Sequence, residues 1–244
     1  MSDLKLRRWT GISGLALVVL DLAMFALYTV FVGPEPEYGD TTRYVEYWSK
    51  IQGVVLTRVF LDILLCAFLL LFATGFCHLV RQARPEYEWM GTLAFAAGVT
   101  LAGITLVAAS LEGGQALDTV GGNASPTIIR AFGEGYLLLY GSIGCMLLAL
   151  FAAAAGYATE RTGLLPGWTA WVAYATAVLN FAAVPLGFSL APAAILAWAV
   201  IASFAFPIWV AIASIYLIVR REVVAPTPAK QVTAEQRVPS GATV

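Results

Sequence analysis

Six long apolar runs, separated by short polar breaks, limit what this chain can fold into. The runs cover residues 10–32, 53–80, 90–111, 128–157, 166–189 and 194–219. Each is long enough to cross the ~30 Å hydrocarbon layer of a bilayer as a helix, which takes about 20 residues. Because lipid offers no hydrogen bonds to the backbone, such runs form helices, whose backbone bonds lie within the segment. The sequence therefore predicts an all-α integral membrane protein, a bundle of six transmembrane helices.

The composition excludes most soluble classes of protein. Of the 244 residues, 60% are hydrophobic and only 12% are charged. A soluble domain carries about 25% charged residues, so this chain cannot build a water-soluble surface. A soluble enzyme, a nucleic-acid binder and a disordered protein are thereby excluded. We expect the lipid bilayer to be the main partner, and the net charge of −1 gives no basic field for nucleic acid.

Histidine and cysteine are too few, and too widely spaced, to indicate a metal or cofactor site. The chain has one histidine, His78, and three cysteines, Cys66, Cys77 and Cys145. There is no Cys-x-x-Cys motif and no Cys/His cluster with metal-ligand spacing. We therefore expect neither a metal site nor a bound cofactor.

Lysine and arginine divide the polar breaks into two sides. Ten basic residues fall on one side: Lys5, Arg7, Arg8, Arg81, Arg84, Arg161, Arg220, Arg221, Lys230 and Arg237. The breaks on the other side contain only Arg43 and Lys50. Basic loops face the cytoplasm, so both termini are predicted to lie inside. We expect a cytoplasmic N-terminus over 1–9, a transmembrane domain over 10–221 and a disordered cytoplasmic tail over 222–244, which is rich in proline and poor in apolar residues.

The first outer break has its own periodicity. Four apolar or aromatic residues recur at helical spacing, namely Tyr44, Tyr47, Trp48 and Ile51. The intervening positions are polar: Arg43, Glu46, Ser49 and Lys50. This pattern predicts a short amphipathic helix lying at the outer membrane surface. The alternative is a plain loop anchored by its aromatic residues.

Charged residues inside the apolar runs are the most informative feature for function. They are Asp21 in the first run, Arg58 and Asp62 in the second, Glu112 at the end of the third, and Arg130 and Glu134 in the fourth. A charge at the bilayer centre costs about 2.5–3.5 kcal/mol on insertion scales. Such residues normally face the bundle interior or a water-filled cavity, and they mark functional sites by default.

Four of these charges occur as two pairs in a repeated pattern. Arg58 with Asp62, and Arg130 with Glu134, both fit R-x-F-x-[DE]-x-x-L, which hints at a duplicated helical hairpin. The i, i+4 spacing places each arginine and its acid on one helix face. Each pair is then either a self-neutralised clip near the outer interface or part of a polar core.

Asp21 has no opposite charge at i±3 or i±4. It must be protonated, face water or pair across helices, and Arg58 and Arg130 are the candidate partners. Pairing would join the first, second and fourth spans into one polar core that opens outward. The candidate ligand-binding residues are Asp21, Arg58, Asp62, Glu112, Arg130, Glu134, Asn180 and Tyr136.

Three functions are compatible with such a core. The favoured one is a binder or carrier of a small amphipathic or lipophilic molecule, with its head group in the polar core. The second is an accessory subunit packed against a membrane protein partner. The third, least favoured, is an acid–base enzyme, a cyclase or isomerase acting on a lipophilic substrate, with Asp21, Asp62 and Glu134 as its catalytic acids. The chain has no nucleophile triad, P-loop or metalloprotease motif.

Three short stretches resemble a known family. They are the second-span start Thr57–Asp62, the turn and fifth-span start Gly163–Trp168, and the ending Ile215–Arg221. In these stretches, and across residues 8–221 as a whole, the chain resembles the small bacterial polytopic membrane proteins of the domain of unknown function 4386 family. The resemblance implies a helical bundle in the inner membrane of a bacterium and no assigned activity.

Overall fold

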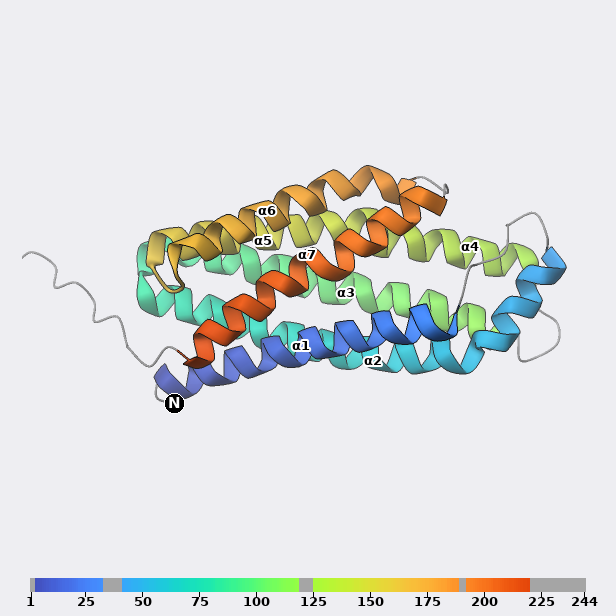
Figure 1. The fold of residues 1–244 in the computed structure, drawn as a ribbon, viewed down its shortest axis with the longest axis horizontal. Coiled ribbons are helices and arrows are strands. Elements are labelled where there is room, and N and C mark those ends of the chain that lie inside the picture. The colour runs from blue at the N-terminus through green and yellow to red at the C-terminus, as the bar shows by residue number, and fades with distance from the viewer. Residues whose placement is uncertain (1–2, 33–40, 119–124, 189–191, 220–244) are drawn as a thin grey trace, which may run out of the picture.

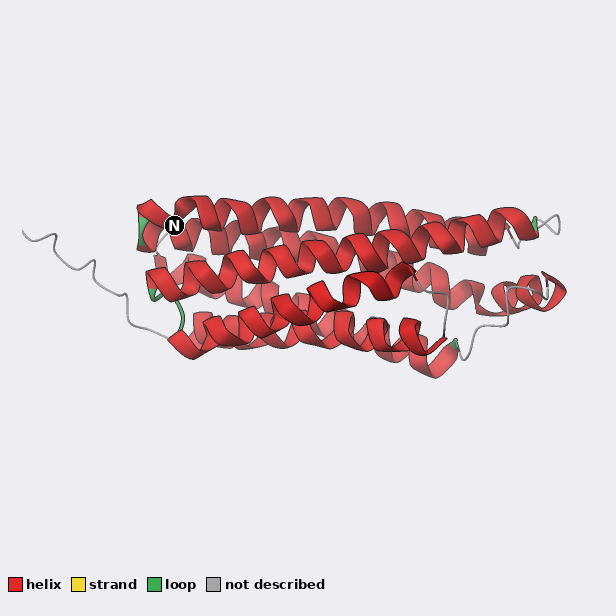
Figure 2. Ribbon diagram, turned by 90° about the horizontal axis from the view of Figure 1, so that it is seen from above, coloured by secondary structure: helices red, strands yellow, loops and turns green. Residues whose placement is uncertain are grey.

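The computed structural model describes residues 3–32, 41–118, 125–188 and 192–219, and within these ranges every regular element is a helix (Figure 2). The α-helices are α1 (Asp3–Phe31), α2 (Thr41–Ala83), α3 (Glu88–Asp118), α4 (Pro126–Leu137), α5 (Gly144–Thr162), α6 (Gly167–Ala183) and α7 (Pro192–Val219). Short 3-10 turns, η1 (Pro85–Tyr87) and η3 (Val184–Phe188), adjoin α3 and α6. A π-helical segment, η2 (Leu138–Ile143), joins α4 and α5 into one continuous helix, so the described residues form six long helices.

Five of these helices are long and apolar enough to cross a membrane. They are Leu4–Phe31, Val45–Ala83, Pro85–Asp118, Thr127–Thr162 and Gly167–Leu186. A shorter apolar helix, Phe204–Val219, lies within α7. The prediction of an all-α membrane bundle is confirmed at this level. Helices α2, α3 and the joined α4–η2–α5 helix extend beyond the predicted apolar runs at both ends, because their polar ends continue the helix, whereas α6 lies within the run 166–189 and is followed there by η3. The tail over 222–244 lies outside the described residues.

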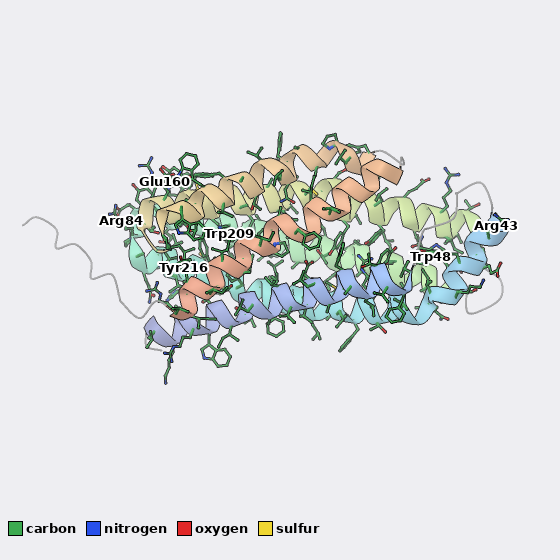
Figure 3. All side chains as sticks on the ribbon, in the orientation of Figure 1. Arg43, Trp48, Arg84, Glu160, Trp209 and Tyr216 are labelled. Atoms are coloured by element: carbon green, nitrogen blue, oxygen red, sulfur yellow. The ribbon has the colours of Figure 1, made fainter. Side chains whose placement is uncertain are left out.

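The helices run side by side along one axis and form a ring (Figure 1). Helix α1 packs on α2 and α7, α2 on α3, α3 on α5, α5 on α6, and α6 on α7. Figure 3 places Arg84, Glu160 and Tyr216 at the end of the bundle where α1 begins, and Arg43 and Trp48 at the opposite end. We call these the Arg84 end and the Trp48 end.

The predicted short helix around residues 43–51 exists, but it is not a separate element. It forms the first turns of the 43-residue helix α2, and these turns tilt away from the rest of α2 in Figure 1. Its apolar residues Trp48 and Ile51 are buried with Val32 and Ile129, from the ends of α1 and α4. Trp48 and Ile51 therefore pack onto the end of the bundle, and the position of this helix at the outer membrane surface stays a prediction.

An aromatic cluster fills the half of the bundle toward the Arg84 end. Trp209 of α7 is fully buried, and its ring centroid lies 6.1–6.3 Å from those of Phe72, Phe76, Phe151 and Phe206 (Figure 3). Buried aromatic side chains contribute large apolar areas and pair in edge-to-face arrangements. This cluster closes the bundle interior on one side of the site described below.

Small residues let α1 approach α7 closely in the same half. A Cβ atom added at Gly11 lies 2.7 Å from the backbone oxygen of Ser214, and one added at Gly14 collides with the side-chain oxygen of Ser214. Without a hydrophobic force between helices in lipid, such close backbone contact is a main source of helix association. The α1–α7 contact therefore depends on these two glycines.

We predict that Gly11→Ala lowers the free energy of unfolding of the protein in mild detergent by about 1–3 kcal/mol, because the new methyl group meets backbone that cannot move aside. The matched control is Gly103→Ala on α3, where an added Cβ has no neighbour within 4 Å. That change should be neutral or stabilising by roughly 0.5–1 kcal/mol, because alanine favours the helix. Equal melting temperatures for the two variants would contradict the close α1–α7 contact.

Candidate functional site

Arg58 of α2 lies at the centre of a buried polar cluster. Its Nη1 donates to Glu112 Oε1 of α3 at 3.0 Å, and its Nη2 donates to the hydroxyl of Tyr136 on α4. Its Nε lies 4.0 Å from Asp62 Oδ2, one turn further along α2. The Arg58 side chain is 12% exposed, and those of Glu112 and Asp62 are 1% exposed. Arg58 therefore joins α2, α3 and α4 through bonds shielded from solvent.

Three tyrosine rings surround the same guanidinium. The Arg58 Cζ atom lies 4.9 Å from the ring centroid of Tyr28, 5.4 Å from that of Tyr136 and 5.8 Å from that of Tyr140. The rings of Tyr136 and Tyr140 stack on each other with centroids 5.6 Å apart. Cation–π attraction at these distances adds to the ion pairs, most strongly where water is excluded. The tyrosines thus hold the arginine in place from α1 and from the α4–η2 segment.

A change of helix type occurs beside this cluster. The π-helical segment Leu138–Ile143 contains Tyr140, and Ser142 within it donates from Oγ to the backbone oxygen of Val184 at 3.0 Å. Single π-helical turns are rare and occur frequently at functional sites. Ser142 is bonded to η3, and Tyr140 in the same segment faces Arg58. We attribute the widened π-helical turn to these two constraints. No sequence signal distinguished this segment from an ordinary helix.

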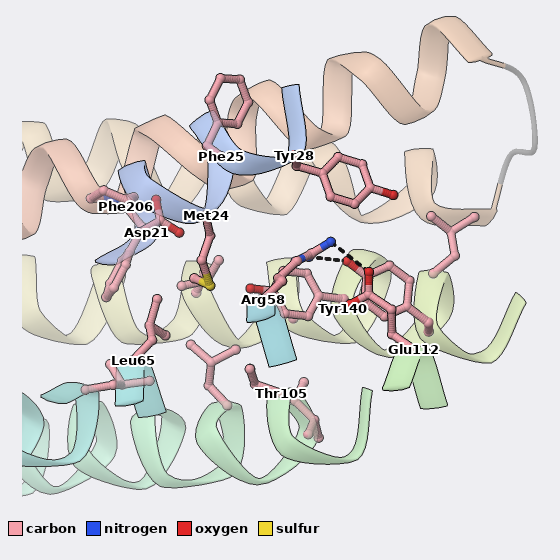
Figure 4. A pocket seen from close by; sticks show the side chains of 18 of the residues that line it. Asp21, Met24, Phe25, Tyr28, Arg58, Leu65, Thr105, Glu112, Tyr140 and Phe206 are labelled. Atoms are coloured by element: carbon pink, nitrogen blue, oxygen red, sulfur yellow. Dashed lines mark hydrogen bonds and ion pairs between the residues drawn. The ribbon is translucent and has the colours of Figure 1, made fainter. Parts of the chain in front are cut away.

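Asp21 of α1 lies in the same interior but apart from Arg58. Figure 4 shows it toward Phe206 and Leu65, while Arg58 and Glu112 lie toward the other end of the view. Asp21 Oδ2 is buried and has no hydrogen-bond partner among the described residues. Neither Arg58 nor Arg130 forms an ion pair with Asp21 in the described part of the chain. Of the three alternatives for Asp21, pairing with an arginine is therefore not the arrangement that the described residues show.

A cavity of about 260 Å³ connects these groups (Figure 4). Its wall comes from α1, α2, α3, the α4–η2–α5 helix and α7. The polar or aromatic residues toward the Trp48 end are Tyr28, Trp48, Arg58, Glu112, Gln115 and Tyr136. The wall at the other end is apolar, with Leu17, Leu65, Leu69, Leu101, Leu148 and Phe206. Asp21 and Thr105 belong to the same wall, so the cavity has a polar end and an apolar end.

The other predicted site residues do not line this cavity. Arg130 and Glu134 pair with each other at 2.8 Å, with side chains 53% and 41% exposed. This pair matches the clip interpretation and lies apart from the Arg58 cluster, so the repeated pattern does not predict equivalent environments. Asn180 is fully buried within α6 and donates from Nδ2 to the backbone oxygen of Thr176 at 2.9 Å. Asp62 does not line the cavity, but it lies within ion-pair distance of Arg58, which does.

Two features of the site were missed by sequence reasoning. Gln115 lines the cavity and donates from Nε2 to the backbone oxygen of Ile129, while its Oε1 has no hydrogen-bond partner among the described residues. Its position three residues after Glu112 places both on one helix face, and that signal was available. The pairing of Arg58 with Glu112 joins residues 54 positions apart, and no local spacing reveals it. Within the described ranges, no group of three or more His, Cys, Asp or Glu side chains can hold a metal ion.

Comparison with known proteins finds no matching family model, no similar curated protein and no similar solved structure. The fold and the site nevertheless define a class. The chain is a polytopic membrane protein, a helical bundle embedded in lipid through its apolar helices, with charged residues buried in its interior.

We predict that Glu112→Gln destabilises the protein in detergent by about 3–5 kcal/mol, because it leaves Arg58 buried without its closest counter-charge. The matched control is Glu134→Gln, which breaks an exposed pair and should cost about 0–1 kcal/mol. The stabilities of the two variants are compared by thermal unfolding in the same detergent.

Replacing all three charged residues of the cluster, Arg58→Met with Glu112→Leu and Asp62→Asn, should restore most of the lost stability, because no unpaired charge remains. Similar losses in Glu112→Gln and Glu134→Gln would contradict the central position of the buried pair.

Proposed function

We propose that this protein binds or carries a small amphipathic or lipophilic molecule in the cavity between α1, α2, α3, the α4–η2–α5 helix and α7. The head group would lie by Arg58, Glu112 and Tyr136, and the tail would lie against the leucines and Phe206. The observation that carries this proposal is the division of one cavity into a charged end and an apolar end. A molecule with the same division satisfies both ends at once.

The size and wall of the cavity support a small ligand. Ligand pockets are mostly apolar, with a few placed polar groups, and have volumes of about 300–1,000 Å³. The volume of about 260 Å³ is close to the lower end of this range. The aromatic cluster around Trp209 and the close α1–α7 contact fill the bundle toward the Arg84 end. A molecule in the cavity would therefore enter from the Trp48 end or from the lipid.

The proposal includes an orientation. Arg84 and the start of α1 lie at one end of the bundle, and Arg43 lies at the other (Figure 3). By the bias of lysine and arginine toward the cytoplasm, the Arg84 end faces inside. With six spans, both termini are then cytoplasmic and the polar end of the cavity is nearer the outer face. The family resemblance over residues 8–221 stays a prediction, as does the bacterial inner membrane that it implies.

The alternatives are less well supported. An acid–base enzyme needs at least two acids at one cavity that no arginine neutralises. Glu112 and Asp62 both lie within ion-pair distance of Arg58, which leaves Asp21 alone. Glu134, the third candidate acid, is exposed and paired with Arg130. An accessory subunit needs a protein partner for its outer face, and lipid accounts for the exposed apolar residues as well.

The test is mass spectrometry of small molecules extracted from protein purified in mild detergent. We expect a defined amphipathic compound in the wild type and much less of it in Asp21→Asn and in Thr105→Phe, which fills the cavity. Glu134→Gln, outside the cavity, should retain as much as the wild type. Equal retention by all four proteins, or a wild type that carries only bulk lipid, would overturn the proposal.

A further inference from the structure

The hydrogen-bond balance of the cavity identifies the chemistry of the head group, an inference that rests on the proposed function. Five buried side-chain oxygens in and beside the cavity have no hydrogen-bond partner among the described residues: Asp21 Oδ2, Asp62 Oδ1, Asp62 Oδ2, Glu112 Oε2 and Gln115 Oε1. Buried polar atoms are nearly always satisfied, so this number at one place needs an explanation. All five are acceptors, and a carboxyl group keeps an acceptor oxygen in either protonation state.

Two side chains of the site already donate hydrogen bonds within the protein. The Arg58 nitrogens Nη1 and Nη2 donate to Glu112 and Tyr136, and the guanidinium lies against three tyrosine rings. The Gln115 amide nitrogen donates to Ile129. An anionic head group would therefore have to compete with Glu112 and Tyr136 for the guanidinium, and it would lie near carboxyl groups that repel it.

The charges of the site also favour a cation over an anion. Among the described residues, the cavity and its border hold three carboxyl groups, those of Asp21, Asp62 and Glu112, and one guanidinium, that of Arg58. The faces of Tyr28, Tyr136 and Tyr140 add negative electrostatic potential toward the same space. A positive charge entering the cavity is thus met by acids and aromatic faces on several helices.

We propose that the head group recognised here is a cationic nitrogen that carries N–H donors, a primary or secondary amine or an amidine, attached to an apolar tail. Its N–H groups supply the donors that Glu112 and Gln115 lack at the polar end of the cavity. Its charge balances the acids that Arg58 does not neutralise. Its tail fills the wall formed by the leucines and Phe206.

The experiment uses the full chain in phosphatidylcholine nanodiscs, and empty nanodiscs correct for partitioning into lipid. Radiolabelled octylamine is titrated by equilibrium dialysis and then displaced by octyltrimethylammonium, octanol or octanoate. The four probes share one tail and differ in charge and in N–H or O–H donors. We expect octylamine to saturate at one molecule per chain. Each competitor should bind about tenfold more weakly or worse, because a charge-assisted hydrogen bond is lost.

Variants locate the binding. Asp21→Asn and Gln115→Leu should each weaken octylamine binding about tenfold, while Glu134→Gln should leave it unchanged. Because the comparison of probes needs only the wild type, a variant that fails to fold does not remove the test.

The outcomes separate this inference from the proposed function. Saturable binding of octanoate or octanol that is tighter than that of octylamine and is lost in Thr105→Phe would overturn the cationic head group and leave a ligand cavity. Equal affinity for octylamine and octyltrimethylammonium would overturn the requirement for N–H donors. The absence of saturable binding by all four probes would overturn the inference, while the extracted-compound analysis would still judge the proposed function.

Discussion

The ion pair between Arg58 and Glu112 holds together the half of the bundle that contains the cavity. It links α2 to α3 at 3.0 Å, and the second terminal nitrogen of Arg58 extends the link to Tyr136 on α4. Placing these charges in a membrane interior is costly, and the cost is offset only while each charge keeps its partners. Because the same residues form the polar end of the cavity, the bonds that stabilise the bundle there also shape its interior.

The two halves of the bundle are built differently. Toward the Arg84 end, aromatic rings around Trp209 and the glycines of α1 fill the interior by close contact. Toward the Trp48 end, tyrosines, a glutamine and charged groups leave open volume between helices, and the π-helical segment changes the course of one wall. Tight packing with apolar side chains leaves few voids, whereas polar groups that lack partners keep space for water or a ligand. The cavity is a consequence of this change in side-chain chemistry along the helices.

Sequence reasoning predicted the helices better than the site. The six apolar runs are a strong local signal, since the length and composition of each run decide whether it can cross a membrane. The partner of Arg58 is not a local property. The i, i+4 spacing predicted Asp62 as the partner of Arg58, yet Glu112 lies closer to Arg58. Which face of α3 meets α2 depends on packing along both helices, and local spacing does not reveal it. Arg130 and Glu134 share the pattern of Arg58 and Asp62 but face outward, since the pattern carries no information on which face meets the bundle. For the same reason, helical periodicity predicted the helix at Trp48 but not its burial against α1 and α4.

An experimental density map of the wild-type protein in lipid tests the central claim most directly. The amphipathic cavity predicts elongated non-protein density between α1, α2 and α3. One end of this density should lie within hydrogen-bonding distance of Glu112 or Gln115, and the other should lie against Leu65 and Phe206. A cavity filled by collapsed side chains, or an Arg58 side chain that reaches the bilayer surface without contacting Glu112, would contradict the claim.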